Sequence, residues 1–362
     1  GLGYKEALNV AVCGIAEFTY AGKRYAVVAA NNHGTTVTTP KHSAIIYELA
    51  PEGVGIVAEI DTLPEAGLGG TVDYTHFVKP VIRKTDNEVF IYLMGGVNGI
   101  AAYKFYDPEY TPDLPPTKVE MVMEKLWEFS AAGENAPETS EISNGLDVYG
   151  DNLYFSRRND AANQVAVYNA LTGMREGYLS TMNGGFNAQY GGDIATDDNG
   201  AIYACNVVIS SYGTLQIVKW ADSEAAPEMF IQTAQHLGTN DTRVGYGMDV
   251  YISSEGNGYV VTPVNATNKV LYWAVSNHSP VSQDPEVLEI QGLLSDNMGT
   301  CARIFAVDST HFWIDGNAIY PTLCTKTDSV ITSSSFPADA SLFSGANGIA
   351  EFNFGGKRYA VV

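Results

Sequence analysis

The sequence predicts an all-β fold, and within that class a β-propeller of four-stranded antiparallel blades. The first observation is a repeated stretch, because residues 14–28 and 348–362 are identical at 12 of 15 positions. The second is that short runs rich in Val, Ile and Tyr, bounded by turn residues, form groups of four, and these groups recur about every 50 residues between these ends. The third is a composition of 22 Tyr and 36 Gly in 362 residues, which suits strands and tight turns. Short antiparallel meanders repeated along a chain favour a propeller over a sandwich or a solenoid.

The first two predicted blades follow from apolar runs of strand length. Residues 14–61 hold four such runs, separated by Gly, Asn, Pro or charged residues. Residues 70–129 hold four more, and in the last of them Val119, Met121 and Met123 alternate with glutamates. Because this period of two is that of a strand, we expect an outer strand there rather than a helix.

The remaining blades are placed by turn chemistry and by a repeated opening. Gly150-Asp151-Asn152 is a tight-turn sequence inside the third unit, and a glycine followed by an aspartate opens the third, fourth and fifth units. The last unit stops after two strands, which residues 8–13 would complete. We favour seven blades in a single domain spanning residues 1–362, with six blades as the alternative. The expected blades are 14–61, 70–129, 144–182, 190–234, 246–291, 300–336 and the partial unit 347–362.

Charge narrows the classes of partner. The formal net charge of −21 opposes nucleic acids and anionic membrane surfaces, which attract clustered Lys and Arg. No run of 18 apolar residues is present, so we expect no membrane-spanning segment. A neutral or cationic ligand is favoured, and we expect a monomer.

The four cysteines, at positions 13, 205, 301 and 324, are too scattered for a disulfide scaffold. Cys301 and Cys324 fall in one predicted blade, so they are either bridged or buried free thiols. The chain opens on Gly-Leu-Gly without a signal peptide, which fits a segment trimmed from a longer precursor. Export is compatible with such a precursor, and we expect an extracytoplasmic protein, periplasmic, cell-surface or secreted.

Acidic residues recur at the first strand of each predicted blade, and in the sixth blade Arg303 takes their place. Since first strands line the channel of a propeller, these side chains would form a ring around it. In one interpretation each carboxylate accepts backbone N–H groups and fixes the spacing of the blades. In the other, the converging acids bind a cation such as Ca²⁺ or the hydroxyls of a ligand. The acids are Glu17, Asp73, Asp147, Asp193, Asp249 and Glu351, of which Glu17, Asp73 and Glu351 are the candidate metal ligands.

Further polar residues are expected at the same mouth. Aromatic faces and planar polar groups around a concave opening suit a sugar, because rings stack on pyranoses while amides and guanidinium groups hold hydroxyls. Asp193, Asp249, Tyr246 and Arg303 are also the candidates for catalysis. The predicted ligand-binding residues are Asn144, Asp147, Arg157, Arg158, Tyr190, Asp193, Arg243, Tyr246, Asp249 and Arg303.

Residues 196–203 fit a loose form of the Asp-box of sialidases, although Asp197 and Gly200 are also what a hairpin turn requires. With the repeated GIAEF-x-x-x-GKRYAVV hairpin and the Gly-x-Asp openings, the chain resembles uncharacterised bacterial extracytoplasmic propellers that are labelled by fold as neuraminidases. This resemblance implies a carbohydrate-binding propeller. The alternatives are a sialidase-like glycoside hydrolase and a non-catalytic scaffold for protein interactions.

Overall fold

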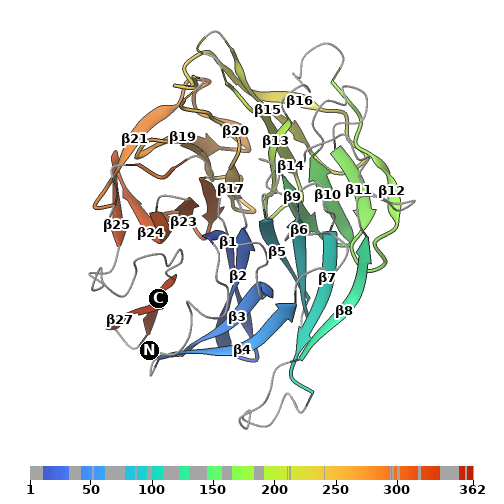
Figure 1. Cartoon of the computed structure of the whole chain (residues 1–362). Helices are drawn as coiled ribbons and strands as arrows, with labels where there is room; N and C mark the ends of the chain where they lie inside the picture. Colours follow the sequence, from blue (N-terminus) through green and yellow to red (C-terminus); the bar gives the residue numbers. More distant parts are fainter. Residues whose placement is uncertain are drawn as a thin grey trace. The chain divides into compact units, whose positions relative to one another are not determined.

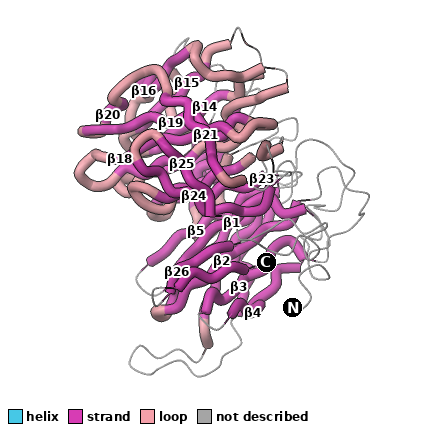
Figure 2. Tube along the Cα trace, turned by 90° about the vertical axis from the view of Figure 1, so that its left-hand side faces the viewer, coloured by secondary structure: helices cyan, strands magenta, loops and turns pink. Residues whose placement is uncertain are grey.

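The computed structural model confirms the all-β class. Its described residues form strands, turns and loops, and no helix occurs among them (Figures 1 and 2). No helix in this part of the chain is therefore long and apolar enough to cross a membrane. The described residues are 11–31, 42–50, 53–61, 78–85, 88–95, 100–108, 122–129, 145–156, 165–182, 191–209, 211, 213–239, 241–293, 295, 297–299, 302–316, 319–334, 350–354 and 357–361.

The chain forms two compact units. Unit 1 comprises residues 1–139, 170–173 and 336–362. It contains two four-stranded antiparallel meanders and one two-stranded sheet, β26–β27. The outer strand predicted from the alternation of methionines and glutamates is present as β8. The strands are β1 (Ala11–Tyr20), β2 (Lys23–Asn31), β3 (His42–Ala50), β4 (Gly53–Asp61), β5 (Val78–Thr85), β6 (Glu88–Gly95), β7 (Ile100–Tyr106), β8 (Val122–Phe129), β26 (Ala350–Phe354) and β27 (Lys357–Val361).

The end of the chain follows the predicted repeat in part. The second copy of the duplicated stretch forms a hairpin, as expected. Residues 11–13, which we expected to complete another blade, instead begin β1 and belong to the first meander.

Aromatic side chains form the core of unit 1. The ring of Phe18 stacks on that of Tyr25, and both meet the edge of Phe105 on β7, with ring centroids 5.1 Å apart in each case. All three side chains are buried. Since aromatic pairs of this kind stabilise a core beyond the burial of their area, they hold the first meander against the second.

Unit 2 comprises residues 140–169 and 174–335. Two four-stranded antiparallel sheets, β9–β12 and β13–β16, are followed by a nine-stranded sheet. Its strands are β9 (Leu146–Tyr149), β10 (Asn152–Ser156), β11 (Val165–Asn169), β12 (Arg175–Tyr178), β13 (Gly191–Thr196), β14 (Ile202–Asn206), β15 (Leu215–Trp220), β16 (Glu228–Thr233), β17 (Asp249–Ile252), β18 (Gly258–Val264), β19 (Lys269–Ser276), β20 (Ser279–Pro280), β21 (Glu286–Gln291), β22 (Arg303–Ala306), β23 (His311–Gly316), β24 (Ile319–Thr327) and β25 (Val330–Ser334).

The nine-stranded sheet joins two meanders that the sequence predicts as separate blades. Their outer strands, β21 and β25, pair in parallel through Ile290 with Ile331 and Gln291 with Thr332. The hydroxyl of Ser333 adds a hydrogen bond to the carbonyl of Gln291 at 2.8 Å. Outer strands usually remain edges, so this pairing covers two edges that would otherwise be exposed.

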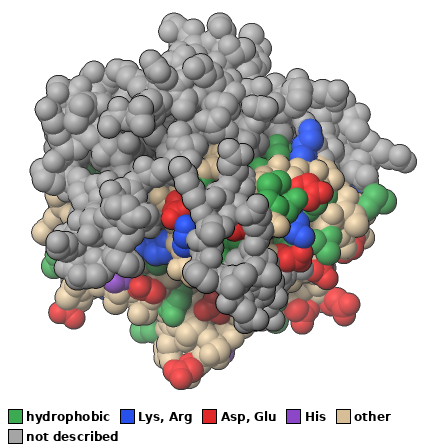
Figure 3. Space-filling model, turned by 90° about the horizontal axis from the view of Figure 1, so that it is seen from below, with side chains coloured by type: hydrophobic (Ala, Val, Ile, Leu, Met, Phe, Trp, Pro, Cys, Tyr) green, Lys and Arg blue, Asp and Glu red, His purple; other side chains and the backbone are tan. Residues whose placement is uncertain are grey.

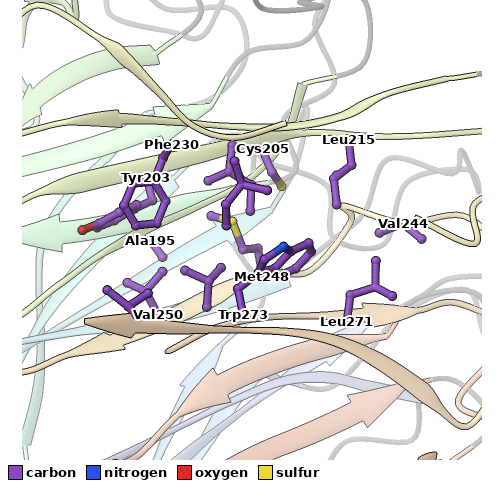
Figure 4. Close-up of a cluster of buried hydrophobic side chains, with 14 of the residues drawn as sticks. Ala195, Tyr203, Cys205, Leu215, Phe230, Val244, Met248, Val250, Leu271 and Trp273 are labelled. Carbon is purple, nitrogen blue, oxygen red and sulfur yellow. The ribbon is translucent and has the colours of Figure 1, made fainter. Parts of the chain in front are cut away.

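The core of unit 2 lies between successive sheets. Figure 4 shows Met248 and Trp273 lying below Cys205 and beside Leu271, and all four side chains are buried. Cys205 and Cys324 are both buried free thiols, so Cys324 forms no bridge to Cys301. Burial raises the pKa of the Cys324 thiol, which keeps it protonated.

Candidate functional site

Aspartates at the starts of three inner strands carry the site in unit 2. Asp147 accepts a hydrogen bond from the backbone N–H of Val148 at 2.8 Å through one carboxylate oxygen. The other oxygen accepts the hydroxyl of Thr196 at 2.9 Å and its backbone N–H at 2.5 Å. Because Thr196 belongs to β13, this carboxylate joins the first strand of one sheet to the first strand of the next.

Asp249 repeats this arrangement two meanders further on, at the start of β17. One oxygen accepts the N–H of Val250 at 2.8 Å, and the other accepts the N–H of Ala306 in β22, also at 2.8 Å. Asp147 aligns with Asp193 in the next meander, and Thr196 lies three residues after Asp193. Asp249 aligns in the same way with Arg303, and Ala306 lies three residues after Arg303, so the two links are equivalent. These hydrogen bonds are those expected in the first interpretation of the acidic residues, in which each carboxylate accepts backbone N–H groups and fixes the spacing of the repeats.

Asp193 lies between these two and has a different partner. Its carboxylate accepts the N–H of Ile194 at 2.9 Å and that of Met248 at 3.2 Å. It also faces the guanidinium of Arg303 at 3.4 Å, and the two side chains are 0% and 6% exposed respectively. A buried carboxylate needs a partner of opposite charge or several donors, and Asp193 has both.

Arg303 extends the network to the surface. Its Nη1 also donates to the carbonyl of Tyr246, which lies three residues before β17 begins at Asp249. The hydroxyl of Tyr246 accepts a hydrogen bond from Nη1 of Arg243 at 2.8 Å, and the Arg243 guanidinium lies 5.8 Å from the centroid of the Tyr246 ring. Tyr246 is buried, whereas Arg243 is exposed. Arg243 is therefore a surface cation held in place by a buried network.

Two glycines allow the backbone to approach this closely. Gly245 has φ of +92°, and a Cβ there would lie 2.1 Å from the carbonyl oxygen of Asn206. Gly192 would place a Cβ 2.8 Å from the sulfur of Cys205. Any side chain at either position would push the sheets apart.

Two hydroxyl groups at this end of the sheets were not predicted. Ser156 donates to the carbonyl of Gly192 at 2.6 Å, and Thr262 donates to the carbonyl of Gly247 at 2.6 Å. Both side chains are buried near the ends of second strands. The signal that could have found them is a lone hydroxyl residue after an otherwise apolar run.

The other predicted site residues divide into two groups. Glu17 lies in unit 1, where its carboxylate pairs with Nε of Arg24 at 2.6 Å. Asn144, Arg157, Arg158, Tyr190 and Asp73 lie outside the described residues, and Glu351 is described only as part of β26. The structure thus brings together Asp193, Tyr246, Arg243 and Arg303, with Asp147 and Asp249 on the adjoining sheets.

Within the described ranges, no group of three or more His, Cys, Asp or Glu residues could hold a metal ion. A calcium site remains a prediction that involves residues outside these ranges. Figure 3 shows acidic side chains dispersed among basic and uncharged ones on one face of the described chain.

The Asp-box-like stretch forms a turn. One carboxylate oxygen of Asp197 accepts the N–H groups of Asn199 and Ala201 at 2.9 and 3.0 Å, and the other accepts the hydroxyl of Tyr203 at 3.0 Å. These bonds shape the β13–β14 hairpin, as the turn interpretation expects. Burial and the neighbouring Asp197 raise the pKa of Asp198 in the same turn.

Four-stranded meanders linked through buried polar residues define a propeller-like, all-β protein. Residues 125–329, more than half of the chain, match the family described as a domain of unknown function, DUF8500, and the chain belongs to that family. No curated protein gives a significant sequence match.

Solved structures resemble the chain in fold. A mutant of AofleA from Arthrobotrys oligospora, with three arginines replaced, has a TM-score of 0.54 at 9% identity and matches 92% of this chain and 90% of its own. A candidate 6-phosphogluconolactonase from Bacteroides uniformis has a TM-score of 0.51 at 10% identity, over 89% and 83%. A functionally unknown protein from Desulfotomaculum acetoxidans has a TM-score of 0.50 at 15% identity, over 92% and 87%. At these identities the likeness concerns the fold alone.

Proposed function

We propose that the chain is an extracytoplasmic β-propeller, a single domain of seven blades, that binds a glycan at the rim beside Arg243 and Tyr246. The four-stranded meanders and the repeated hairpin support the propeller. The extracytoplasmic location rests on the family resemblance of the sequence.

One observation carries the binding proposal, which is the pairing of Arg243 with Tyr246. The guanidinium lies over the tyrosine ring and donates to its hydroxyl, while the tyrosine backbone is held by Arg303. Holding the arginine in advance lowers the entropy lost when it grips a ligand. A planar, exposed set of N–H donors is suited to sugar hydroxyls, and it needs no large apolar pocket.

The aspartates favour recognition over the hydrolase alternative. A glycosidase needs two carboxyl groups that flank the scissile bond, one of them protonated. In Asp147, Asp193 and Asp249, both carboxylate oxygens already accept hydrogen bonds from the protein. These hydrogen bonds support a structural role for the three aspartates at the starts of the strands.

The test is binding of neutral and sialylated oligosaccharides, first on an array and then by calorimetry with the best binder. We expect Arg243→Ala to weaken binding about tenfold or more, since a hydrogen bond to a charged group contributes about 1.5–3 kcal/mol. Arg175→Ala is the matched control, because Arg175 also lies over a tyrosine ring, that of Tyr178, at 5.5 Å. It should leave the affinity unchanged.

Two outcomes would overturn the proposal. Binding to no oligosaccharide on the array would remove its basis. Equal losses in Arg243→Ala and Arg175→Ala would place the ligand elsewhere. Each mixture is also examined by mass spectrometry, and cleavage products would favour the glycoside hydrolase instead.

A further inference from the structure

The hairpin β26–β27 repeats β1–β2 in register as well as in sequence. In the first copy Glu17 pairs with Ala26, and in the second Glu351 pairs with Ala360. The remaining pairs of β26–β27 have the same counterparts in β1–β2, up to the last pair before each turn. The two hairpins are thus interchangeable in backbone pairing.

The place that β1–β2 occupies depends on residues that both copies share. β2 pairs with β3 through Tyr25 with Glu48 and Val27 with Ile46. Phe18 and Tyr25 form the aromatic core with Phe105. The positions matching Phe18, Tyr25 and Val27 in the second copy are Phe352, Tyr359 and Val361.

The three positions that differ have opposing effects. The hydroxyl of Tyr20 accepts the N–H of Asp107 at 3.3 Å, and Phe354 has no hydroxyl to replace it. Ala21 has φ of +49°, a conformation that favours glycine, and Gly355 stands at the matching position. Thr19 is exposed, so Asn353 is neutral there. The loss of one hydrogen bond is offset by relief of backbone strain.

We propose that β26–β27 is a second partner for β3 and exchanges with β1–β2 within one chain. β27 contacts β4, the neighbour of β3, in the same compact unit. Since β3 pairs with one hairpin at a time, the edge of β3 is a binding site whose occupant is either residues 16–27 or residues 350–361. This inference is independent of any ligand.

Disulfide trapping tests the exchange. Val27→Cys with Ile46→Cys traps the arrangement in the structure, because these residues are register partners. Val361→Cys with Ile46→Cys traps the exchanged form. We expect both disulfides to form within single chains under mild oxidation, mapped by peptide mass spectrometry. Val361→Cys with Ile91→Cys, on the buried centre of β6, is the control that should stay reduced.

Variants of the first hairpin should shift the yield of the exchanged disulfide in opposite directions. Ala21→Gly strengthens β1–β2 and should lower the yield about fivefold, whereas Tyr20→Phe weakens it and should raise the yield about fivefold. The proposal is overturned if the cysteines introduced at positions 361 and 46 form no disulfide while those at positions 27 and 46 do. A disulfide only between chains, or a yield that neither variant changes, would also overturn it.

Discussion

Asp193 and Arg303 form a buried ion pair that links β13 to β22 past the segment that leads into β17. The carboxylate and guanidinium are 3.4 Å apart, and the guanidinium also donates to the carbonyl of Tyr246. Arg303 stands where the first strands of the other three meanders of unit 2 have an aspartate. Arg303 therefore neutralises the Asp193 carboxylate, and its contacts tie three successive meanders together.

We predict that Arg303→Met lowers the free energy of unfolding by about 3–5 kcal/mol, because it leaves the Asp193 carboxylate buried without its countercharge. The measurement is urea denaturation followed by tryptophan fluorescence. Arg243→Met removes an exposed guanidinium from the same network and should cost less than about 1 kcal/mol.

The double variant Asp193→Asn with Arg303→Met separates charge from packing. It should recover part of the loss, since the amide oxygen of asparagine still accepts a backbone N–H while no charge is left buried. A double variant as unstable as the sum of both single variants would show that the ion pair is not the cause.

The equivalent links of Asp147 and Asp249 predict matched losses. Asp147→Ala and Asp249→Ala each remove the acceptor of backbone N–H groups in two successive meanders, so each should cost about 2–3 kcal/mol. Asp241→Ala is the control, because this aspartate is exposed on a loop. Thermal unfolding of the three variants in parallel is the measurement, and a loss in Asp241→Ala as large as in the other two would count against the links.

Calcium distinguishes the two interpretations of these acids. If Asp147 and Asp249 serve only to link successive meanders, millimolar Ca²⁺ or a chelator should not change the melting temperature of the unsubstituted protein. The melting temperatures of Asp147→Ala and Asp249→Ala should be equally insensitive. A rise in melting temperature with Ca²⁺ that Asp249→Ala abolishes would show a cation site there.

Gly245 and Gly22 offer a matched pair for backbone strain. Both have positive φ, +92° and +76°, but a Cβ at Gly22 meets nothing within 4 Å, whereas one at Gly245 meets the carbonyl of Asn206 at 2.1 Å. Gly22→Ala should therefore cost about 1–2 kcal/mol from the backbone alone. Gly245→Ala adds a clash with main chain and should cost at least about 2 kcal/mol more. Equal losses in chemical denaturation would contradict this.

The sequence was sufficient to predict the all-β class and the starts of the inner strands, because glycine and aspartate have local reasons to stand there. It was not sufficient to predict the partners. Asp147 reaches Thr196 and Asp249 reaches Ala306, so each link depends on how consecutive repeats stack. The pairing of β21 with β25 was missed for the same reason, since both strands carry ordinary edge patterns.

The candidate site was predictable in its residue types but not in its use. Asp193 and Arg303 were singled out as ligand-binding and catalytic residues, and the structure shows them paired with each other. Repetition of an acid in the first strands of the meanders of unit 2 other than that of Arg303 favours a structural role, and the contacts within the described residues agree. The exposed Arg243 has no repeated counterpart, which is why it is the stronger candidate for ligand recognition.

The turn between β22 and β23 predicts a pH dependence. Partial burial alone would raise the pKa of Asp308, but hydrogen bonds from the backbone N–H of Thr310 and from the side chain of His311 outweigh it and lower the pKa below its ordinary value of 3.8. Because the pKa of Asp308 is lower in the folded state, its ionised carboxylate stabilises the folded protein at pH values above 3.8. This stabilisation is lost as the pH falls through the folded-state pKa. We therefore expect Asp308→Ala to be less stable than the unsubstituted protein at pH 7. The difference should be less than about 1 kcal/mol, because the side chains of Asp308 and His311 are partly accessible to solvent. The difference should shrink in acid, as measured by urea denaturation from pH 7 to pH 2, and a difference that grows in acid would contradict the assignment.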